Sequence, residues 1–224
     1  MATGTSDYWG NKLLNFSLGG AALSAPTTVY LALFNVMPTK ASTGATEVSG
    51  GSYARQAITC SSANFPAASA QLIKLANNGA SVTFPTATAD WSTPSVPTVG
   101  WGFYDAVTSG NLLYMSPFIS TWYPMTATTT GNTFRGTGYT PSAGDTVMLE
   151  AITGVALPGG FSADTVYYVI SPSGDTFSLS ATSGGSAITV SADGGGLVGV
   201  VQAQAIRNGN MVSVATNQIT IQGS

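Results

Sequence analysis

Short β-prone runs separated by turn residues recur along almost the whole chain, and they restrict it to an all-β fold. Residues 27–34 are rich in β-branched, aromatic and aliphatic side chains, and the run is long enough for one central strand. Residues 52–60 alternate between polar and apolar side chains, as a half-buried strand does. Residues 72–75 and 80–84 are predicted to pair through the hairpin turn Asn77-Asn78-Gly79. The first half is therefore predicted to be an antiparallel, β-sandwich-like domain.

One short helix is expected near the N-terminus. Ser6 is a suitable N-cap, and the glycines that begin at Gly19 provide a stop. Trp9, Leu13 and Phe16 fall at positions i, i+4 and i+7, so they share one apolar face. That face either lies on a sheet of its own domain or docks on a neighbouring subunit.

The character of the sequence changes at about residue 126. Residues 126–142 are rich in Thr and Gly and nearly free of aliphatic side chains, which is typical of a loop or a domain boundary. Short strands with Gly-rich turns are expected to follow at close spacing, which favours a small β-sandwich or barrel module. These strands are expected over residues 146–152, 165–170, 176–180, 187–190 and 197–202.

Charged side chains are scarce, and histidine is absent. Charged residues make up 7% of the chain, against about a quarter in ordinary soluble proteins. The net charge is −3 and the six cations are scattered, so the chain lacks the basic stripe of a nucleic-acid binder. The centres of protein interfaces are depleted in charge, and a weakly charged lone monomer tends to associate. The composition therefore favours a subunit that is covered by its neighbours.

No catalytic, metal or cofactor site is expected, because the required motifs are missing. A glycan depolymerase would need two carboxylates facing each other at about 5–10 Å, and turn capping explains most of the acidic residues. The chain has no histidine, no calcium-loop motif and no Gly-Lys-Ser/Thr phosphate loop. No apolar stretch approaches the ~20 residues that span a bilayer, so membrane insertion is not expected. The acidic residues considered are Asp90, Asp105, Asp145, Glu150 and Asp164.

Exposed aromatic rings offer a route to carbohydrate binding without catalysis. Trp91 and Trp101 are the candidates for stacking on a sugar, although aromatic side chains in small β domains also form cores. Trp122 and Tyr123 lie at the expected domain boundary, where they are candidates for packing against another subunit or between domains. The candidate interface residues are therefore Trp9, Leu13, Phe16, Trp122 and Tyr123.

Six sequence blocks resemble one protein family. The most specific block is EVSGGSYARQ at residues 47–56, and VTFPTATADW at residues 82–91 is nearly as specific. In their order, the blocks resemble a family of structural proteins from tailed bacteriophages, known as tail fibre proteins. The other four blocks are YWGNKLLN (8–15), VYLALF (29–34), GFYDA (102–106) and GNLLY (110–114).

The resemblance implies an interrupted domain. The closing segment that follows soon after these blocks in the family is similar to residues 208–221, much later in this chain. We therefore expect a discontinuous virion-attachment domain formed by residues 1–125 and 206–224. Residues 126–205 would form an inserted β module, similar to a small module that recurs in phage virion proteins.

The resemblance also implies a non-enzymatic virion structural protein, made in the cytoplasm of the bacterial host. Such a protein would assemble as part of the tail fibre or of its attachment to the tail. Its expected partners are copies of itself, in a homo-oligomer for which a trimer is considered, and other tail or capsid proteins. Two alternatives stay open: a head decoration or cement protein, and a carbohydrate-binding adhesin module that contacts a host surface glycan.

Overall fold

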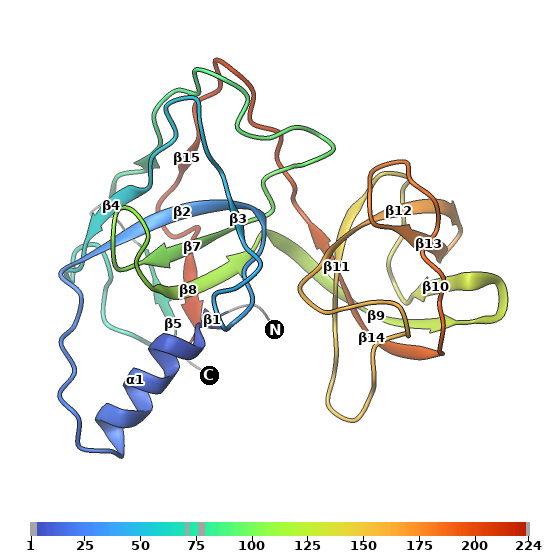
Figure 1. Cartoon of the computed structure of the whole chain (residues 1–224), viewed down its shortest axis with the longest axis horizontal. Coiled ribbons are helices and arrows are strands. Elements are labelled where there is room, and N and C mark those ends of the chain that lie inside the picture. Colours follow the sequence, from blue (N-terminus) through green and yellow to red (C-terminus); the bar gives the residue numbers. More distant parts are fainter. Residues whose placement is uncertain (1–3, 70–71, 76–78, 223–224) are drawn as a thin grey trace. The chain divides into compact units, whose positions relative to one another are not determined.

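The structure is a computed structural model, and it describes residues 4–69, 72–75 and 79–222. Strands account for 39% of the chain and helices for 7%, which confirms the all-β fold class. The chain divides into two compact units (Figure 1). One unit is formed by Pro117–Ala203, and we call it the barrel unit. The other, the sheet unit, is formed by the described residues of 2–116 and 204–224.

The main sheet of the sheet unit is built around the long strand β2 (Thr28–Val36). Consecutive side chains from Leu31 to Phe34 are at most 1% exposed, so this strand is covered on both faces, as its continuous apolar run predicts. The sheet has the order β1-β8-β7-β2-β3, and β4 also pairs with β2. Its other strands are β1 (Gly4–Thr5), β3 (Thr46–Glu47), β4 (Gln56–Thr59), β7 (Gly100–Tyr104) and β8 (Leu112–Pro117).

Two small sheets join the middle of the chain to its C-terminal segment. Strand β5 (Leu72–Lys74) pairs with β16 (Thr220–Gln222), and β6 (Val82–Thr83) pairs with β15 (Ser213–Val214). The hairpin predicted between residues 72–75 and 80–84 is therefore wrong, because each strand takes a partner from far along the chain. The Asn77-Asn78 part of the predicted turn lies outside the described residues.

The helix α1 (Asp7–Ser17) begins where the sequence predicts. The Ser6 hydroxyl accepts a hydrogen bond from the Trp9 backbone N–H at 3.2 Å, which is the N-cap geometry. The Ser6 backbone N–H donates to the Leu113 carbonyl at 2.9 Å, so the start of the helix is tied to β8. Trp9 is buried, and its indole N–H donates to the Tyr114 hydroxyl at 2.8 Å.

The barrel unit is a closed antiparallel barrel with the strand order β10-β13-β12-β11-β14-β9. Closure removes the free sheet edges that small β modules otherwise expose. Its core is apolar: Phe134, Val147, Val169 and Leu179 are all completely buried. The strands are β9 (Ile119–Thr128), β10 (Thr133–Gly136), β11 (Thr146–Glu150), β12 (Val166–Ser173), β13 (Thr176–Ser180) and β14 (Gly194–Val201).

Two local expectations for this region are wrong. Residues 126–142 are not one loop, since they contain the end of β9, the 3-10 turn Thr130–Asn132 and all of β10. Residues 187–190, expected as a strand, are irregular, although Val190 contributes to the core. Thr-rich strands with a single large apolar residue, such as Phe134, give almost no periodic signal.

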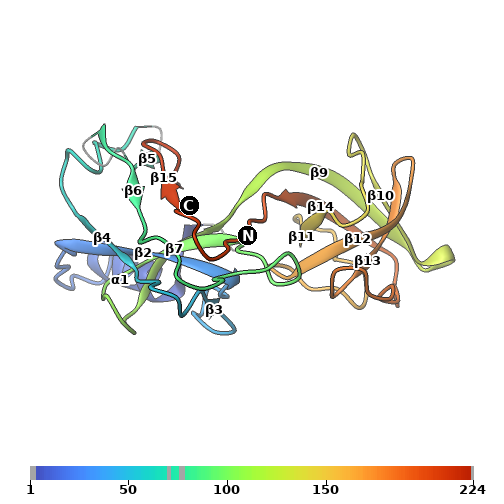
Figure 2. The same ribbon diagram turned by 90° about the horizontal axis from the view of Figure 1, so that it is seen from above.

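The chain enters and leaves the barrel unit through paired strands. Ile119 of β9 pairs with Val201 of β14, and the Gln202 backbone N–H donates to the Phe118 carbonyl at 2.6 Å. Figure 2 shows β9 and β14 running along each other through the unit. In the part of the chain that the structure describes, no helix is long and apolar enough to cross a membrane.

Candidate functional site

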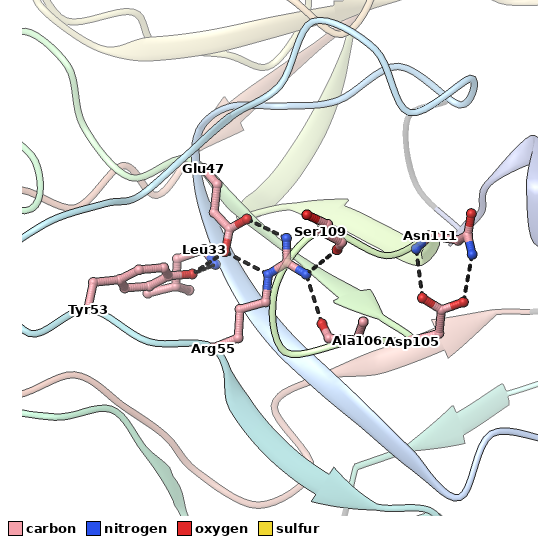
Figure 3. Close-up of polar contacts among 8 residues, drawn as sticks. All are labelled: Leu33, Glu47, Tyr53, Arg55, Asp105, Ala106, Ser109 and Asn111. Atoms are coloured by element: carbon pink, nitrogen blue, oxygen red, sulfur yellow. Dashed lines mark hydrogen bonds and ion pairs between the residues drawn. The ribbon is translucent and has the colours of Figure 1, made fainter.

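The two sequence blocks at residues 47–56 and 102–106 come together in one polar network (Figure 3). Its centre is the ion pair between Glu47, at the end of β3, and Arg55, just before β4. The Arg55 Nε donates to Glu47 Oε1 at 2.9 Å, and Nη2 donates to Oε2 at 2.7 Å. Such a two-point contact uses the planar fork of the guanidinium group fully. The side chains are 8% and 25% exposed for Arg55 and Glu47, so the pair is largely shielded from water.

Arg55 also fastens the turn between β7 and β8. Its Nη1 donates to the carbonyl oxygens of Ala106 at 2.9 Å and of Ser109 at 2.7 Å. The guanidinium carbon lies 3.6 Å from the centre of the Tyr104 ring, in a cation–π arrangement. Burial lowers the pKa of Arg55, but the hydrogen bonds and charge of Glu47 outweigh it, so the pKa is raised. The cation is therefore held in its charged form.

Tyr53 connects this ion pair to the core. Its hydroxyl donates to Glu47 Oε1 at 3.0 Å and accepts the Leu33 backbone N–H at 2.9 Å. The Tyr53 ring stacks on Phe84 with a centroid separation of 6.0 Å and meets the edge of Trp91 at 5.3 Å. Burial raises the pKa of Tyr53 well above its ordinary value, and the negative charge of Glu47 adds to that effect. The hydroxyl therefore stays protonated and acts as a structural donor.

Asp105 closes the same turn from the other side. Its Oδ1 accepts the Asn111 backbone N–H at 2.7 Å, and its Oδ2 accepts the Asn111 side-chain amide at 2.8 Å. We call Glu47, Tyr53, Arg55, Asp105 and Asn111 the polar clamp. Each of its charged groups is engaged with a partner inside the network. The polar clamp therefore ties β3, β4 and the β7–β8 turn together, and it presents no activated nucleophile or acid–base pair.

A shallow hollow of ≈ 430 Å³ lies between α1 and the main sheet. Tyr8, Lys12, Tyr30 and Asp105 are among the residues that line it. The Lys12 ammonium group is 4.8 Å from the centre of the Tyr8 ring, and Asp105 is already bonded to Asn111. These lining residues therefore bring together no pair of groups that is suited to proton transfer.

Two of the remaining acidic candidates, Asp90 and Asp145, act as structural acceptors. Asp90 Oδ2 accepts from Arg207 at 2.6 Å and its Oδ1 from the Asn208 backbone N–H at 2.9 Å. The Asn208 bond and then the Arg207 bond lower the pKa of Asp90. Asp145 accepts a hydrogen bond from the Tyr139 hydroxyl at 2.6 Å. Asp145 lies in the barrel unit, together with Asp164, which has a left-handed backbone conformation, and the buried Glu150. Among the described residues no cluster of acidic, Cys or His side chains could hold a metal ion.

The candidate aromatic residues fall into two groups. Trp9, Trp91 and Trp101 are 8%, 5% and 6% exposed, so all three are core residues of the sheet unit and offer no free ring face. The Trp91 indole N–H donates to the Gly51 carbonyl at 2.7 Å. Trp122 and Tyr123 are half-buried on β9, where Tyr123 stacks on Tyr139 with the centroids 5.4 Å apart.

Helix α1 carries an apolar surface that the sequence pattern identified only in part. Leu13 and Phe16 are 37% and 54% exposed, so they are available for the contact with another subunit that remains a prediction. Leu14 and Leu18 are more exposed, at 58% and 85%. The sequence pattern that begins at Trp9 does not include them, because Leu14 and Leu18 form a second i, i+4 pair on the other side of the helix.

One comparison with known proteins gives a match. A family model described as "Podophage GP4 fiber I protein gp80" matches residues 4–123, which is more than half of the chain. The matched range holds the polar clamp, α1 and strands β1 to β8, and it ends within β9. No curated protein matches the chain.

Proposed function

We propose that this chain, which belongs to the podophage GP4 fiber I protein gp80 family, is a non-enzymatic subunit of the tail fibre or of its attachment to the tail. Membership of that family makes it a phage fibre structural protein of the virion. It would be made in the bacterial cytoplasm and then assemble with copies of itself and with other virion proteins. Both units of the chain would belong to this subunit, although the family match covers mainly the sheet unit.

The polar clamp is the observation that carries this proposal. The block that resembles the family most specifically, residues 47–56, places its charged and aromatic residues in a closed structural network. In this network Arg55 contacts Glu47, Ala106, Ser109 and Tyr104. An enzyme would instead direct such groups toward a cavity with perturbed acid and base residues. A network that fixes strands and turns suits a protein whose task is to hold its shape within an assembly.

We further propose that the barrel unit is an insertion in the sheet unit. The pairing of Ile119 with Val201 brings the two ends of the barrel unit together, and domain insertion is tolerated where the ends lie close. The family match also stops at residue 123, shortly after the barrel unit begins. The sheet unit would then be the virion-attachment domain and the barrel unit an addition to it.

Immunogold electron microscopy of intact virions tests the location. An antibody against the purified protein should label the tail or its fibres, and pre-absorbing the antibody with the protein should abolish the signal. Gold particles distributed over the capsid would contradict the proposal and would favour the head decoration alternative. Glycan-array binding that is lost when the half-buried Trp122 is replaced would favour the adhesin alternative instead.

A further inference from the structure

The last described stretch of the chain, residues 204–222, completes the sheet unit as an extended segment. We call it the C-terminal strap; it contains β15 and β16, and Figure 1 shows its strand β15 in red. Its backbone bonds along one earlier stretch of the sheet unit, residues 72–98. Ile206 and Ile219 of the strap are core residues, 5% and 3% exposed. The sheet unit is therefore incomplete until the strap docks.

The strap begins to bond to the sheet unit immediately after the barrel unit ends. Thr98 and Gln204 exchange two backbone hydrogen bonds, of 2.8 and 2.9 Å. The Trp91 backbone N–H donates to the Ile206 carbonyl at 2.9 Å, and the Ser92 hydroxyl accepts the Ile206 backbone N–H at 2.7 Å. These partners of the strap all precede the barrel unit in the chain.

The whole barrel unit therefore separates the strap from the segments that it contacts. The main sheet uses only strands from β1 to β8, which all precede β9. Once that sheet has formed, residues 117–203, a segment of roughly 90 residues, still lie between it and the strap. Closing a flexible loop costs conformational entropy, and each halving of the loop length favours closure about threefold. An unfolded barrel segment therefore opposes docking of the strap.

Folding of the barrel unit removes most of that loop. The Gln202 backbone N–H donates to the Phe118 carbonyl at 2.6 Å, and Ile119 pairs with Val201. These contacts leave about four residues between the main sheet and the strap, which favours docking on the order of 100-fold. The barrel unit can form before the strap docks, because its apolar core comes from residues 125–198 alone.

We propose that the barrel unit acts as a folding clamp, which closes first and thereby brings the C-terminal strap to its docking site on the sheet unit. This inference goes beyond the proposed function, because it gives the barrel unit a role that does not depend on the place of the protein in the virion. The clamp acts by shortening a loop and requires no contact between the two units. A covalent link between the ends of the barrel unit should therefore replace it.

Hydrogen exchange of the full chain with a disrupted barrel tests the clamp. Every protein in the comparison carries Cys60→Ser, which removes the one native thiol. Phe134→Asp places a charge at a completely buried position and should unfold the barrel unit. The amides of residues 204–222 should then lose about 100-fold in protection relative to the Cys60→Ser parent, because the loop is long again.

A disulfide across the ends of the barrel unit should restore docking. Thr121 and Val200 are partners across β9 and β14, so Thr121→Cys/Val200→Cys is within the reach of a disulfide. In the Phe134→Asp chain, oxidation leaves a loop of about nine residues and should raise strap protection about 30-fold. Reduction should reverse the gain. In the matched control Thr128→Cys/Thr133→Cys, the disulfide joins β9 to β10 across a short turn, and its oxidation should leave strap exchange unchanged.

Two results of this comparison would overturn the clamp. Strap amides that stay protected while the barrel amides exchange freely would show that the barrel unit is not needed. Strap protection that stays lost after oxidation would show that loop length is not what the barrel unit changes.

Refolding from urea repeats the test with Phe134 intact, so that a soluble disrupted barrel is not required. Pulse labelling should find the strap protected sooner in oxidised than in reduced Thr121→Cys/Val200→Cys, and equal rates would refute the clamp. The immunogold result is separate, because gold over the capsid would contradict the proposed function without affecting the order of folding.

Discussion

At the scale of single residues, the Glu47–Arg55 pair shows how a chain with few charges uses them. Two of its fifteen charged side chains are placed in a largely shielded position, where desolvation is costly unless every polar atom is satisfied. The remaining contacts of the Arg55 guanidinium group come from the carbonyl oxygens of Ala106 and Ser109 and from the Tyr104 ring. The other ion pairs, such as Arg207 with Asp90, lie in the open and contribute little by comparison.

Replacing Arg55 should test this difference. Arg55→Met should lower the free energy of unfolding by about 2–4 kcal/mol, because Glu47 would keep its shielded position without a counter-charge. Arg207→Met, at a pair whose side chains are 49% and 42% exposed, should have a much smaller effect. Urea denaturation of the three proteins gives both values. A loss for Arg55→Met as small as the one expected for Arg207→Met would show that the polar clamp does not stabilise the sheet unit.

At the scale of elements, the contact between β9 and β14 depends on a glycine. Gly199 pairs with Trp122 across the two strands, and the six-membered part of the indole ring covers the glycine. A Cβ atom on Gly199 would lie 2.6 Å from Trp122 Cζ3, which is closer than a real contact allows. The absence of a side chain in β14 therefore makes room for the largest side chain in β9.

Gly199→Ala should displace the Trp122 ring and destabilise the barrel unit by about 1–3 kcal/mol. Iodide should then quench more of the tryptophan fluorescence, since Trp9, Trp91 and Trp101 are buried in the other unit. In a Trp122→Ala background the same alanine should cost far less, because the clash is gone. An equal cost in both backgrounds would place the effect of the substitution in the strand backbone instead.

At the scale of the whole molecule, two units with separate topologies share one chain. The barrel unit has its own core and closes on itself, with β14 bonded to both β9 and β11. The sheet unit depends on long-range pairing, because its C-terminal strands β15 and β16 return to β6 and β5. The barrel unit is therefore expected to fold as a continuous fragment, whereas the sheet unit needs both of its separate chain segments.

Residues 117–203 expressed alone should fold and unfold cooperatively, because their core and strand closure lie within the fragment. A shorter fragment of residues 117–181 should fail to fold, since it lacks β14 and leaves β9 and β11 without their shared partner. Thermal unfolding followed by circular dichroism compares the two. The lack of a cooperative transition in the longer fragment would contradict the insertion proposed above.

The stability of the whole protein should hardly change with pH near neutrality, because the chain has no histidine. Below about pH 4 stability should fall: hydrogen bonds lower the pKa of Asp90 and Asp193 in the folded state, so protonation favours unfolding. Above about pH 10 it should fall again, since burial raises the pKa of Tyr53 and Tyr139, and ionisation favours the unfolded chain. Urea midpoints from pH 3 to 11 should show a plateau; a step between pH 5.5 and 7.5 would contradict this account.

Local patterns in the sequence determined the fold class, the helix with its Ser6 cap and most of the buried strands, because strand periodicity and capping depend on neighbouring residues. They also marked the blocks that form the polar clamp, though not the pairing of Glu47 with Arg55. The sequence did not predict Thr-rich strands such as β10, because such strands have no periodic pattern of apolar residues.

Only the tertiary structure decided which surfaces stay open and which strands meet. Trp91 and Trp101 became core residues, whereas Leu14 and Leu18 were left in solvent. The pairing of β5 with β16 replaced the local hairpin that Asn-Gly predicted. The physical reason is that burial and strand pairing are set by the packing of segments far apart in the chain, and a local pattern carries no information about such partners.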